Sequence, residues 1–192
     1  MNVLALMGSP KKKGSTSTLA KAIIDGAEEY GHHTEVIYLS DLTIKDCRGC
    51  MACRETAACV IRDDIAIVEE AIKKANTIIF ASPTHWGNMS GIMLRTIERL
   101  FGFLILEQSR GFPVKRHGNG KKAILVTACS TPYPFHWVFN QTRALFGRFH
   151  EVCRYSGIEI VGKIALPGTL GMKSVPEKYL AKAKGMGGKI RP

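Results

Sequence analysis

The sequence predicts an α/β fold in which a five-stranded, doubly wound parallel sheet carries helices on both faces. Apolar runs rich in β-branched residues alternate with amphipathic segments, which is the pattern of repeated βαβ units. Each connection between strands includes a predicted helix, and right-handed crossovers of this kind cover both faces of a sheet. No internal repeat or second domain interrupts the pattern, so we expect a single domain over residues 1–192.

The predicted elements alternate along the whole chain. Strands are expected at residues 3–7, 34–39, 77–81, 123–127 and 159–166. Helices are expected at residues 16–30, 64–75, 90–106, 135–155 and, with a weaker pattern, 176–184. The connecting segments are a cysteine-rich loop at 46–60, a polar, glycine-rich loop or lid at 107–120, and a glycine-rich tail at 185–192 that we expect to fray.

Composition indicates a globular protein that stays in the cytoplasm. The chain is 45% apolar and 22% charged, and no stretch reaches the roughly 18 apolar residues of a membrane span. The segment Met1–Met7 lacks the basic region and cleavage site of a secretory signal and is typical of a first strand. In a reducing cytoplasm the six cysteines favour metal or redox roles over disulfides.

The net charge of +11 does not by itself indicate nucleic-acid binding. The basic residues fall in short, scattered sets, and no helix-turn-helix or RNA-binding motif accompanies them. Solvated surface lysines account for most of this charge, and a positive field suits a phosphorylated cofactor equally well. We therefore expect neither a nucleic acid nor a membrane as partner.

The segment after the first strand, Gly8–Thr18, has the features of a phosphate-binding loop. It leads into a helix, whose N-terminus offers unpaired N–H groups and the positive end of the helix dipole. It is neither a Walker A loop nor a dinucleotide fingerprint. An ordinary N-cap at Ser15 or Thr16 is the alternative, but a cap does not need so many hydroxyls. The candidate cofactor-binding residues here are Ser9, Lys11, Ser15, Thr16, Ser17 and Thr18.

This loop resembles the first loop of the NADPH-dependent FMN reductase family, a branch of the flavodoxin-like proteins, which reads Gly-Ser-Pro followed by Gly-x-Thr. The resemblance implies a flavodoxin-like sheet with strand order 2-1-3-4-5. It also implies that Ser9, Ser15, Ser17 and Thr18, together with backbone amides, bind the 5′-phosphate of FMN.

The segments after the third and fourth strands are the other two candidate flavin loops. Ser82–Gly91 resembles the family's second loop, and His85 stands where relatives often carry tyrosine. The resemblance implies that backbone amides and Trp86 line the isoalloxazine ring, although a packing role for Trp86 and a turn-forming role for Asn88 are the alternative. The candidate residues are Pro83, Thr84, His85, Trp86, Gly87, Asn88 and Met89 in the second loop, and Thr127, Ser130 and Thr131 in the third. Cys129 is either a small packing residue or a redox thiol.

Four cysteines lie close together in the loop after the second strand: Cys47, Cys50, Cys53 and Cys59. Three thiolates at this spacing can surround one face of a cuboidal cluster that the fourth closes, whereas structural zinc sites more often use two separated Cys-x-x-Cys pairs. The spacing resembles that of the iron–sulfur flavoproteins, a subgroup of the same family, and implies that these four residues hold a [4Fe–4S] cluster. Zinc and free thiols remain the alternatives. Asp63 or Asp64 is expected to cap the next helix.

The sequence thus predicts an FMN-dependent electron-transfer oxidoreductase in which the flavin, not an acid, base or nucleophile, carries the chemistry. NAD(P)H or a ferredoxin-type protein is the expected electron donor, and a small molecule is the expected acceptor. The resemblance also implies a homodimer or tetramer, for which residues 101–106 and 132–137 are candidate interface segments. The alternatives are a cluster-free NAD(P)H-dependent FMN or quinone reductase and a non-enzymatic carrier of flavodoxin type.

Overall fold

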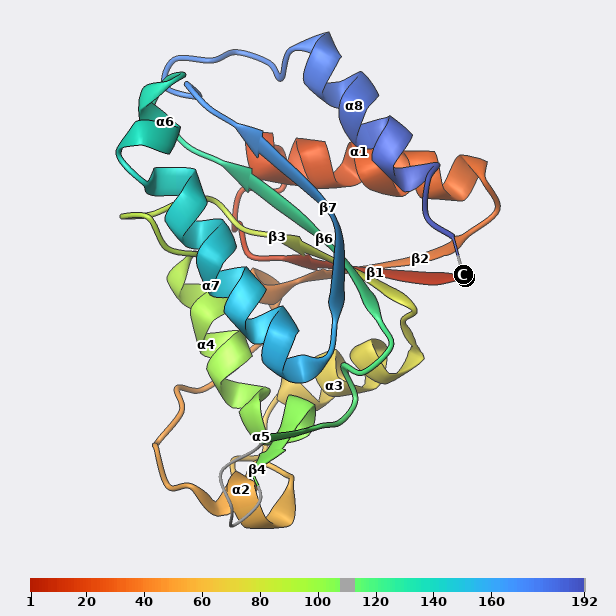
Figure 1. Cartoon of the computed structure of the whole chain (residues 1–192), viewed down its shortest axis with the longest axis vertical. Helices are drawn as coiled ribbons and strands as arrows, with labels where there is room; N and C mark the ends of the chain where they lie inside the picture. The colour runs from red at the N-terminus through yellow and green to blue at the C-terminus, as the bar shows by residue number, and fades with distance from the viewer. Residues whose placement is uncertain (108–112, 192) are drawn as a thin grey trace.

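In the computed structural model, which describes residues 1–107 and 113–191, five parallel strands form one sheet in the order β2-β1-β3-β6-β7 (Figure 1). These strands are β1 (Asn2–Met7), β2 (His33–Tyr38), β3 (Thr77–Ala81), β6 (Lys122–Ala128) and β7 (Glu159–Leu166). All five match predicted strands to within a residue at either end. Because β4 and β5 lie outside this sheet, the order is the predicted 2-1-3-4-5.

Helices cover both faces of the sheet, as predicted (Figure 1). One face carries α1 (Ser15–Glu29) and α8 (Glu177–Gly187), and the other carries α3 (Ile65–Lys74), α4 (Gly91–Arg99) and α7 (Gln141–Ser156). Side chains alternate along β1, so that Val3, Ala5 and Met7 pack under α1 while Leu4 and Leu6 pack under the opposite layer. The connection between β2 and α3 contains two short turns of helix, η1 (Leu39–Asp41) and α2 (Ala52–Thr56).

The predicted helix at 90–106 is interrupted at Leu100 and wrong at its last two residues. Helix α4 ends at Arg99, a short α5 (Phe101–Leu104) follows, and the chain then becomes the strand β4 (Ile105–Glu107). This strand pairs antiparallel with β5 (Pro113–Lys115), so the predicted loop or lid at 107–120 is partly a hairpin. Its residues 108–112 lie outside the described part of the chain. A short apolar run fits a helix and a strand equally well, which is why periodicity misplaced this boundary.

The predicted helix at 135–155 is interrupted. It consists of α6 (Phe135–Val138) and the longer α7, which are separated by Asn140 in the left-handed conformation at φ 57°. Asparagine adopts this conformation more readily than most residues, and its side-chain oxygen accepts a hydrogen bond from Arg143 at 3.0 Å. The break redirects the chain before α7 packs on the sheet.

The glycine-rich tail packs against the domain instead of fraying. Helix α8 continues to Gly187, and Ile190 is buried in the core beside α1. A Cβ atom at Gly187 would lie only 2.0 Å from the carbonyl oxygen of Ile23, and one at Gly26 would lie 2.1 Å from that of Lys184. These two glycines therefore allow α1 and α8 to cross in close contact. The sequence does not distinguish such glycines from those of a flexible tail.

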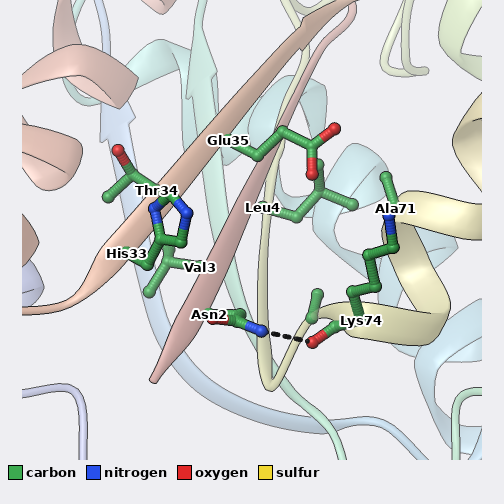
Figure 2. Close-up of a pocket in the computed structure, with 9 residues that line it drawn as sticks. Asn2, Val3, Leu4, His33, Thr34, Glu35, Ala71 and Lys74 are labelled. Atoms are coloured by element: carbon green, nitrogen blue, oxygen red, sulfur yellow. Dashed lines mark hydrogen bonds between the residues drawn. The ribbon is translucent and has the colours of Figure 1, made fainter.

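A pocket of about 310 Å³ lies at the amino ends of β1 and β2 (Figure 2). Asn2, His33 and Lys74 are among its lining residues. This is the edge of the sheet opposite the carboxyl ends of the strands, where ligands of doubly wound sheets bind. Among the helices of the described residues, none combines the length and apolar character needed to cross a membrane.

Candidate functional site

Three loops at the carboxyl edge of the sheet are held together by buried polar contacts. The Gly8 amide after β1 donates to the carbonyl of Ala81 in β3 at 2.7 Å. The Ser90 hydroxyl donates to the carbonyl of Gly8 at 2.6 Å, and the Ser90 amide donates to the Ser82 hydroxyl at 2.8 Å. Ser82 and Ser90 therefore fix the first loop against the second. Sequence analysis did not assign them this role, because only the fold brings Ser90 to Gly8.

The first loop presents an open helix N-terminus. Gly14 is the N-cap of α1, no side chain caps the helix, and its first turn contains no acidic residue. Thr18 makes the first intrahelical bond, to the carbonyl of Gly14 at 2.9 Å. Among the described residues, the amides of Ser15, Thr16 and Ser17 have no protein acceptor. This arrangement suits an anion, and the ordinary side-chain N-cap considered above is absent.

The hydroxyl groups of this loop divide into two sets. Ser17 is fully buried and donates its proton to the carbonyl of Lys11 at 2.9 Å, so its hydroxyl fastens the loop. The Ser9 oxygen accepts from the Lys11 amide at 3.3 Å and keeps its own proton free to donate. Ser15 and Thr18 are half-buried, Thr16 is buried, and the Lys11 side chain is exposed. The free amides and the hydroxyls of Ser9, Ser15 and Thr18 are therefore the groups of this loop that can donate to an anion.

The second loop is a tight two-residue turn whose tip is Trp86. His85 and Asn88 exchange backbone hydrogen bonds of 2.9 Å, and Trp86 and Gly87 have φ values of 52° and 71°. Positive φ at both central positions is the geometry of a type I′ turn, which disfavours a bulky residue such as tryptophan. Trp86 is nevertheless 99% exposed, so it makes no packing contact that would explain its presence. The packing role considered for Trp86 is therefore wrong for this chain.

The remaining residues of the second loop point in different directions. Thr84 and Pro83 are half-buried, His85 is exposed, and Met89 is buried in the core below α4. Asn88 accepts a hydrogen bond from the Met89 amide at 2.9 Å, which makes it a turn former as well as a candidate contact. Met89 can therefore contribute only its backbone to a ligand at the loop.

The third loop is joined to the second through two threonines. The hydroxyls of Thr84 and Thr127 lie 2.8 Å apart, and the Thr84 amide donates to the carbonyl of Ala128 at 3.0 Å. Ser130 is exposed and Thr131 is half-buried beside it. Burial raises the pKa of Cys129, so its thiol stays protonated near neutral pH, as befits a packing residue. Thus residues from all three predicted loops lie along one edge of the sheet.

Exposed aromatic side chains continue from this edge onto α6. Tyr133 is 78% exposed and Trp137 is 56% exposed, and Phe135 and Phe139 stack on each other at the surface. By contrast, Phe103 and Leu104 of the other predicted interface segment are buried in the core. An exposed apolar surface of this kind is characteristic of a contact region.

The cysteine loop lies at the other end of α4 from the second loop. Ser90 caps the beginning of α4, whereas α2, which contains Cys53, packs beside α5 and β4 beyond the end of α4 (Figure 1). The nine residues of α4 span about 14 Å at 1.5 Å per residue. The two candidate cofactor regions of one chain are therefore separated by about the length of this helix.

The four thiols of this loop form a chemically suitable but loosely gathered donor set. Cys47 and Cys50 are exposed, and Cys53 and Cys59 are half-buried. Burial raises the pKa of Cys53, the neighbouring Cys59 and Cys47 add to this effect, and a backbone hydrogen bond from Gly102 opposes it. Within the described ranges, no three histidine, cysteine or acidic side chains lie close enough to hold a single metal ion. Thiolate sulfur is the donor that structural zinc sites and iron–sulfur clusters share, so the chemistry of this loop suits a metal centre of either kind.

An ion pair missed by the sequence analysis closes the base of this loop. Arg99, at the end of α4, is buried and contacts the Asp63 carboxylate at 2.7 Å and 3.1 Å. Burial would raise the pKa of Asp63, but hydrogen bonds led by that from Arg99 outweigh it and lower the pKa below the ordinary value. The N-cap of α3 is Asp64, whose side chain makes no capping hydrogen bond, whereas Asp63 accepts from the Ile65 amide at 3.1 Å.

The family model described as NADPH-dependent FMN reductase matches residues 1–163. An iron–sulfur flavoprotein of Archaeoglobus fulgidus is 39% identical over 99 residues, covering 52% of this chain and 48% of that protein. Another, from Methanosarcina thermophila, is 30% identical over 115 residues, covering 60% of this chain and 58% of that protein. The chain thus spans about half the length of the curated relatives it matches.

Solved structures agree in fold at low sequence identity. An NAD(P)H:quinone oxidoreductase from Methanothermobacter marburgensis superimposes with a TM-score of 0.80 at 18% identity, covering 98% of each chain. An azoreductase from Bacillus anthracis superimposes with a TM-score of 0.74 at 15% identity, covering 99% of this chain and 100% of that one. These likenesses confirm the flavodoxin-like fold.

Proposed function

Because the chain belongs to the NADPH-dependent FMN reductase family, we propose that it is an FMN-dependent oxidoreductase that binds the flavin at the carboxyl edge of its sheet. The observation that carries this proposal is the open N-terminus of α1. Three free amides, no capping side chain and the hydroxyls of Ser9, Ser15 and Thr18 meet the needs of a phosphate dianion. The second and third loops share this edge with the first, which supports our placing the flavin ring beside them.

We further propose that Cys47, Cys50, Cys53 and Cys59 hold a [4Fe–4S] cluster. The support is the four-thiol donor set on one loop, together with relatives that are named iron–sulfur flavoproteins. When bound, FMN supplies two-electron exchange with a donor such as NAD(P)H, and the cluster carries single electrons. The chain itself binds, orients and electrostatically tunes both groups, and a ferredoxin-type protein is the alternative donor.

The experiment that tests this function is anaerobic purification followed by analysis of flavin, iron and sulfide. We expect one FMN per chain, about four irons with matching sulfide, and bleaching of the flavin absorption by NADH or NADPH. Bound FMN with turnover but without iron would favour the cluster-free reductase. Bound FMN with a stable one-electron reduced form and negligible turnover would favour the non-enzymatic carrier. Protein that takes up no FMN would contradict the whole proposal.

Trp86 offers a direct test of the flavin surface. Because its side chain is almost fully exposed, Trp86→Ala should change the free energy of unfolding by no more than about 0.5 kcal/mol. If the indole stacks on the flavin, the same variant should weaken FMN binding about tenfold, since aromatic stacking contributes about 0.5–1.5 kcal/mol. Titration with FMN, followed by flavin fluorescence, measures this. Tyr30→Ala, another exposed aromatic on the far end of α1, should bind FMN normally.

We also propose that a second copy of the chain covers the aromatic surface of Tyr133, Phe135, Trp137 and Phe139. These side chains lie next to the flavin loops, and their exposure in one chain supports burial against a partner. A homodimer or tetramer would then enclose the flavin edge. Sedimentation analysis should detect this oligomer, and Trp137→Glu should shift it towards the monomer.

A further inference from the structure

The guanidinium of Arg99 uses every one of its donors inside the protein. Nη1 donates to the carbonyl of Lys45 at 2.8 Å and to Asp63 at 2.7 Å, and Nη2 donates to the carbonyl of Ile61 at 3.0 Å and to Asp63 at 3.1 Å. The remaining donor, Nε, points at the Sγ atom of Cys59 at 3.3 Å. The side chain is fully buried. Such complete use of a buried guanidinium requires its planar, forked shape.

The groups that Arg99 binds stand at the two ends of the cysteine loop. Lys45 precedes the loop, and Ile61 and Asp63 follow it. Asp63 reinforces the closure by accepting from the Lys45 amide at 3.0 Å. One side chain from α4 therefore joins the entrance and the exit of a loop that carries four thiols. Closing the loop in advance removes part of the entropy that the loop would otherwise lose when its thiols converge on a ligand.

Residues that follow Arg99 in the chain pack against the cysteine loop. Gly102 in α5 packs against Cys53, since a Cβ atom at Gly102 would lie only 2.5 Å from the Cys53 Cβ. Arg116 donates to the carbonyls of both Ala57 and Gly102 at 2.9 Å. The α4–α5 junction thus packs against Cys53, and Arg99 supplies Cys59 with a charged donor.

We propose that Arg99 is a positioning residue for the iron–sulfur cluster: it closes the cysteine loop and donates a hydrogen bond to the sulfur of Cys59. This inference rests on the proposed function. Hydrogen bonds to cluster sulfurs stabilise the more negatively charged, reduced state and are one of the protein's means of setting a cluster potential. Arg99 accordingly favours both retention of the cluster and its reduction by one electron.

The test compares Arg99→Lys with Arg95→Lys in the anaerobically reconstituted, FMN-bound protein. Lysine keeps the charge but cannot reach Cys59, Asp63 and two carbonyls at once. Arg95 lies one turn earlier on α4 and contacts the carbonyl of Ile44 and the carboxylate of Asp46 at the surface, and among the described residues it has no hydrogen bond to a cysteine. The measurements are iron release to a chelator and the midpoint potential of the cluster, followed by electron paramagnetic resonance during titration with dithionite.

We expect Arg99→Lys to lose iron at least tenfold faster and to have a more negative cluster potential. A tenfold change in the equilibrium constant for one-electron reduction of the cluster corresponds to a change of about 59 mV in its midpoint potential. Arg95→Lys should match the wild type in both measurements. FMN uptake reports on folding, because the flavin loops lie at the opposite end of α4. Should Arg99→Lys fail to take up FMN, Asp63→Asn, which keeps the Nε donor but weakens the closure, should still release iron faster.

The outcomes separate this inference from the proposed function. Wild-type protein that binds FMN but no iron and sulfide would refute the cluster, and with it the role of Arg99. A wild-type cluster whose iron release and potential are unchanged in Arg99→Lys would refute the role of Arg99 alone. Faster iron release without a change of potential would refute the hydrogen bond to sulfur and leave only closure of the loop.

Discussion

Replacing Ser15 by aspartate should weaken FMN binding by about 100-fold, or about 2.8 kcal/mol. The new carboxylate would stand at the first residue of α1, where the free amides receive the phosphate. Two like charges about 4 Å apart repel by about 4 kcal/mol in a partly solvated site, and the phosphate is a dianion. The same carboxylate would compete for those amides. The dissociation constant of FMN, measured by fluorescence titration of the apoprotein, checks the prediction.

Although Ser15→Asp should weaken FMN binding, it should not destabilise the folded apoprotein. An acidic residue near a helix N-terminus stabilises the helix by about 0.3–1 kcal/mol, and the first turn of α1 has none in the wild type. The unfolding midpoint of apo Ser15→Asp should therefore equal or exceed that of the wild type. Asn119→Asp adds one negative charge in the turn before β6, at the opposite edge of the sheet, and should leave FMN binding unchanged. Normal FMN affinity in Ser15→Asp would place the phosphate elsewhere.

The second large effect is expected from the ion pair beneath the cysteine loop. Asp63→Ala should lower the free energy of unfolding by about 3–5 kcal/mol, because it leaves the buried Arg99 guanidinium without its counter-charge. The neighbouring Asp64→Ala removes a hydrogen bond of 2.7 Å from the Thr43 amide but breaks no ion pair found in the described structure. It should cost about 1 kcal/mol. Urea unfolding of both variants in the apo form measures the difference.

The effect of Asp63 should also depend on pH in a defined direction. Its pKa in the folded protein lies below the ordinary value, despite burial, because of the hydrogen bonds from Arg99 and from the Lys45 and Ile65 amides. The contribution of Asp63 to the free energy of unfolding is therefore complete above its pKa in the unfolded chain, about 3.9. This contribution is lost as the pH falls through its pKa in the folded protein. The stability difference between wild type and Asp63→Ala should be constant near neutral pH and shrink below about pH 4. A difference that stays constant down to strongly acidic pH would contradict the ion-pair explanation.

Local sequence patterns were sufficient to predict the strands of the sheet and the loops that follow their carboxyl ends. Buried parallel strands are short apolar runs such as Thr77–Ala81, and their bounds were predicted correctly because few other structures suit such runs. The loop that leads into α1 was also predictable, since its glycines, its hydroxyls and the helix that follows are contiguous. The boundary errors fell at Ile105 and Asn140, where the same apolar pattern suits more than one structure.

The sequence by itself thus determined the order of strands and helices, the three loops that share one edge, and the four thiols that share one loop. Tertiary structure alone decided which hydroxyls are free, as Ser17 turns to Lys11 while Ser15 does not. It also decided that Arg99 meets Cys59 and Asp63, and that Gly26 and Gly187 allow two helices to cross. The physical reason is that periodicity and turn chemistry act between neighbours in the chain. Contacts of buried polar groups and close backbone crossings depend on residues that only folding brings together.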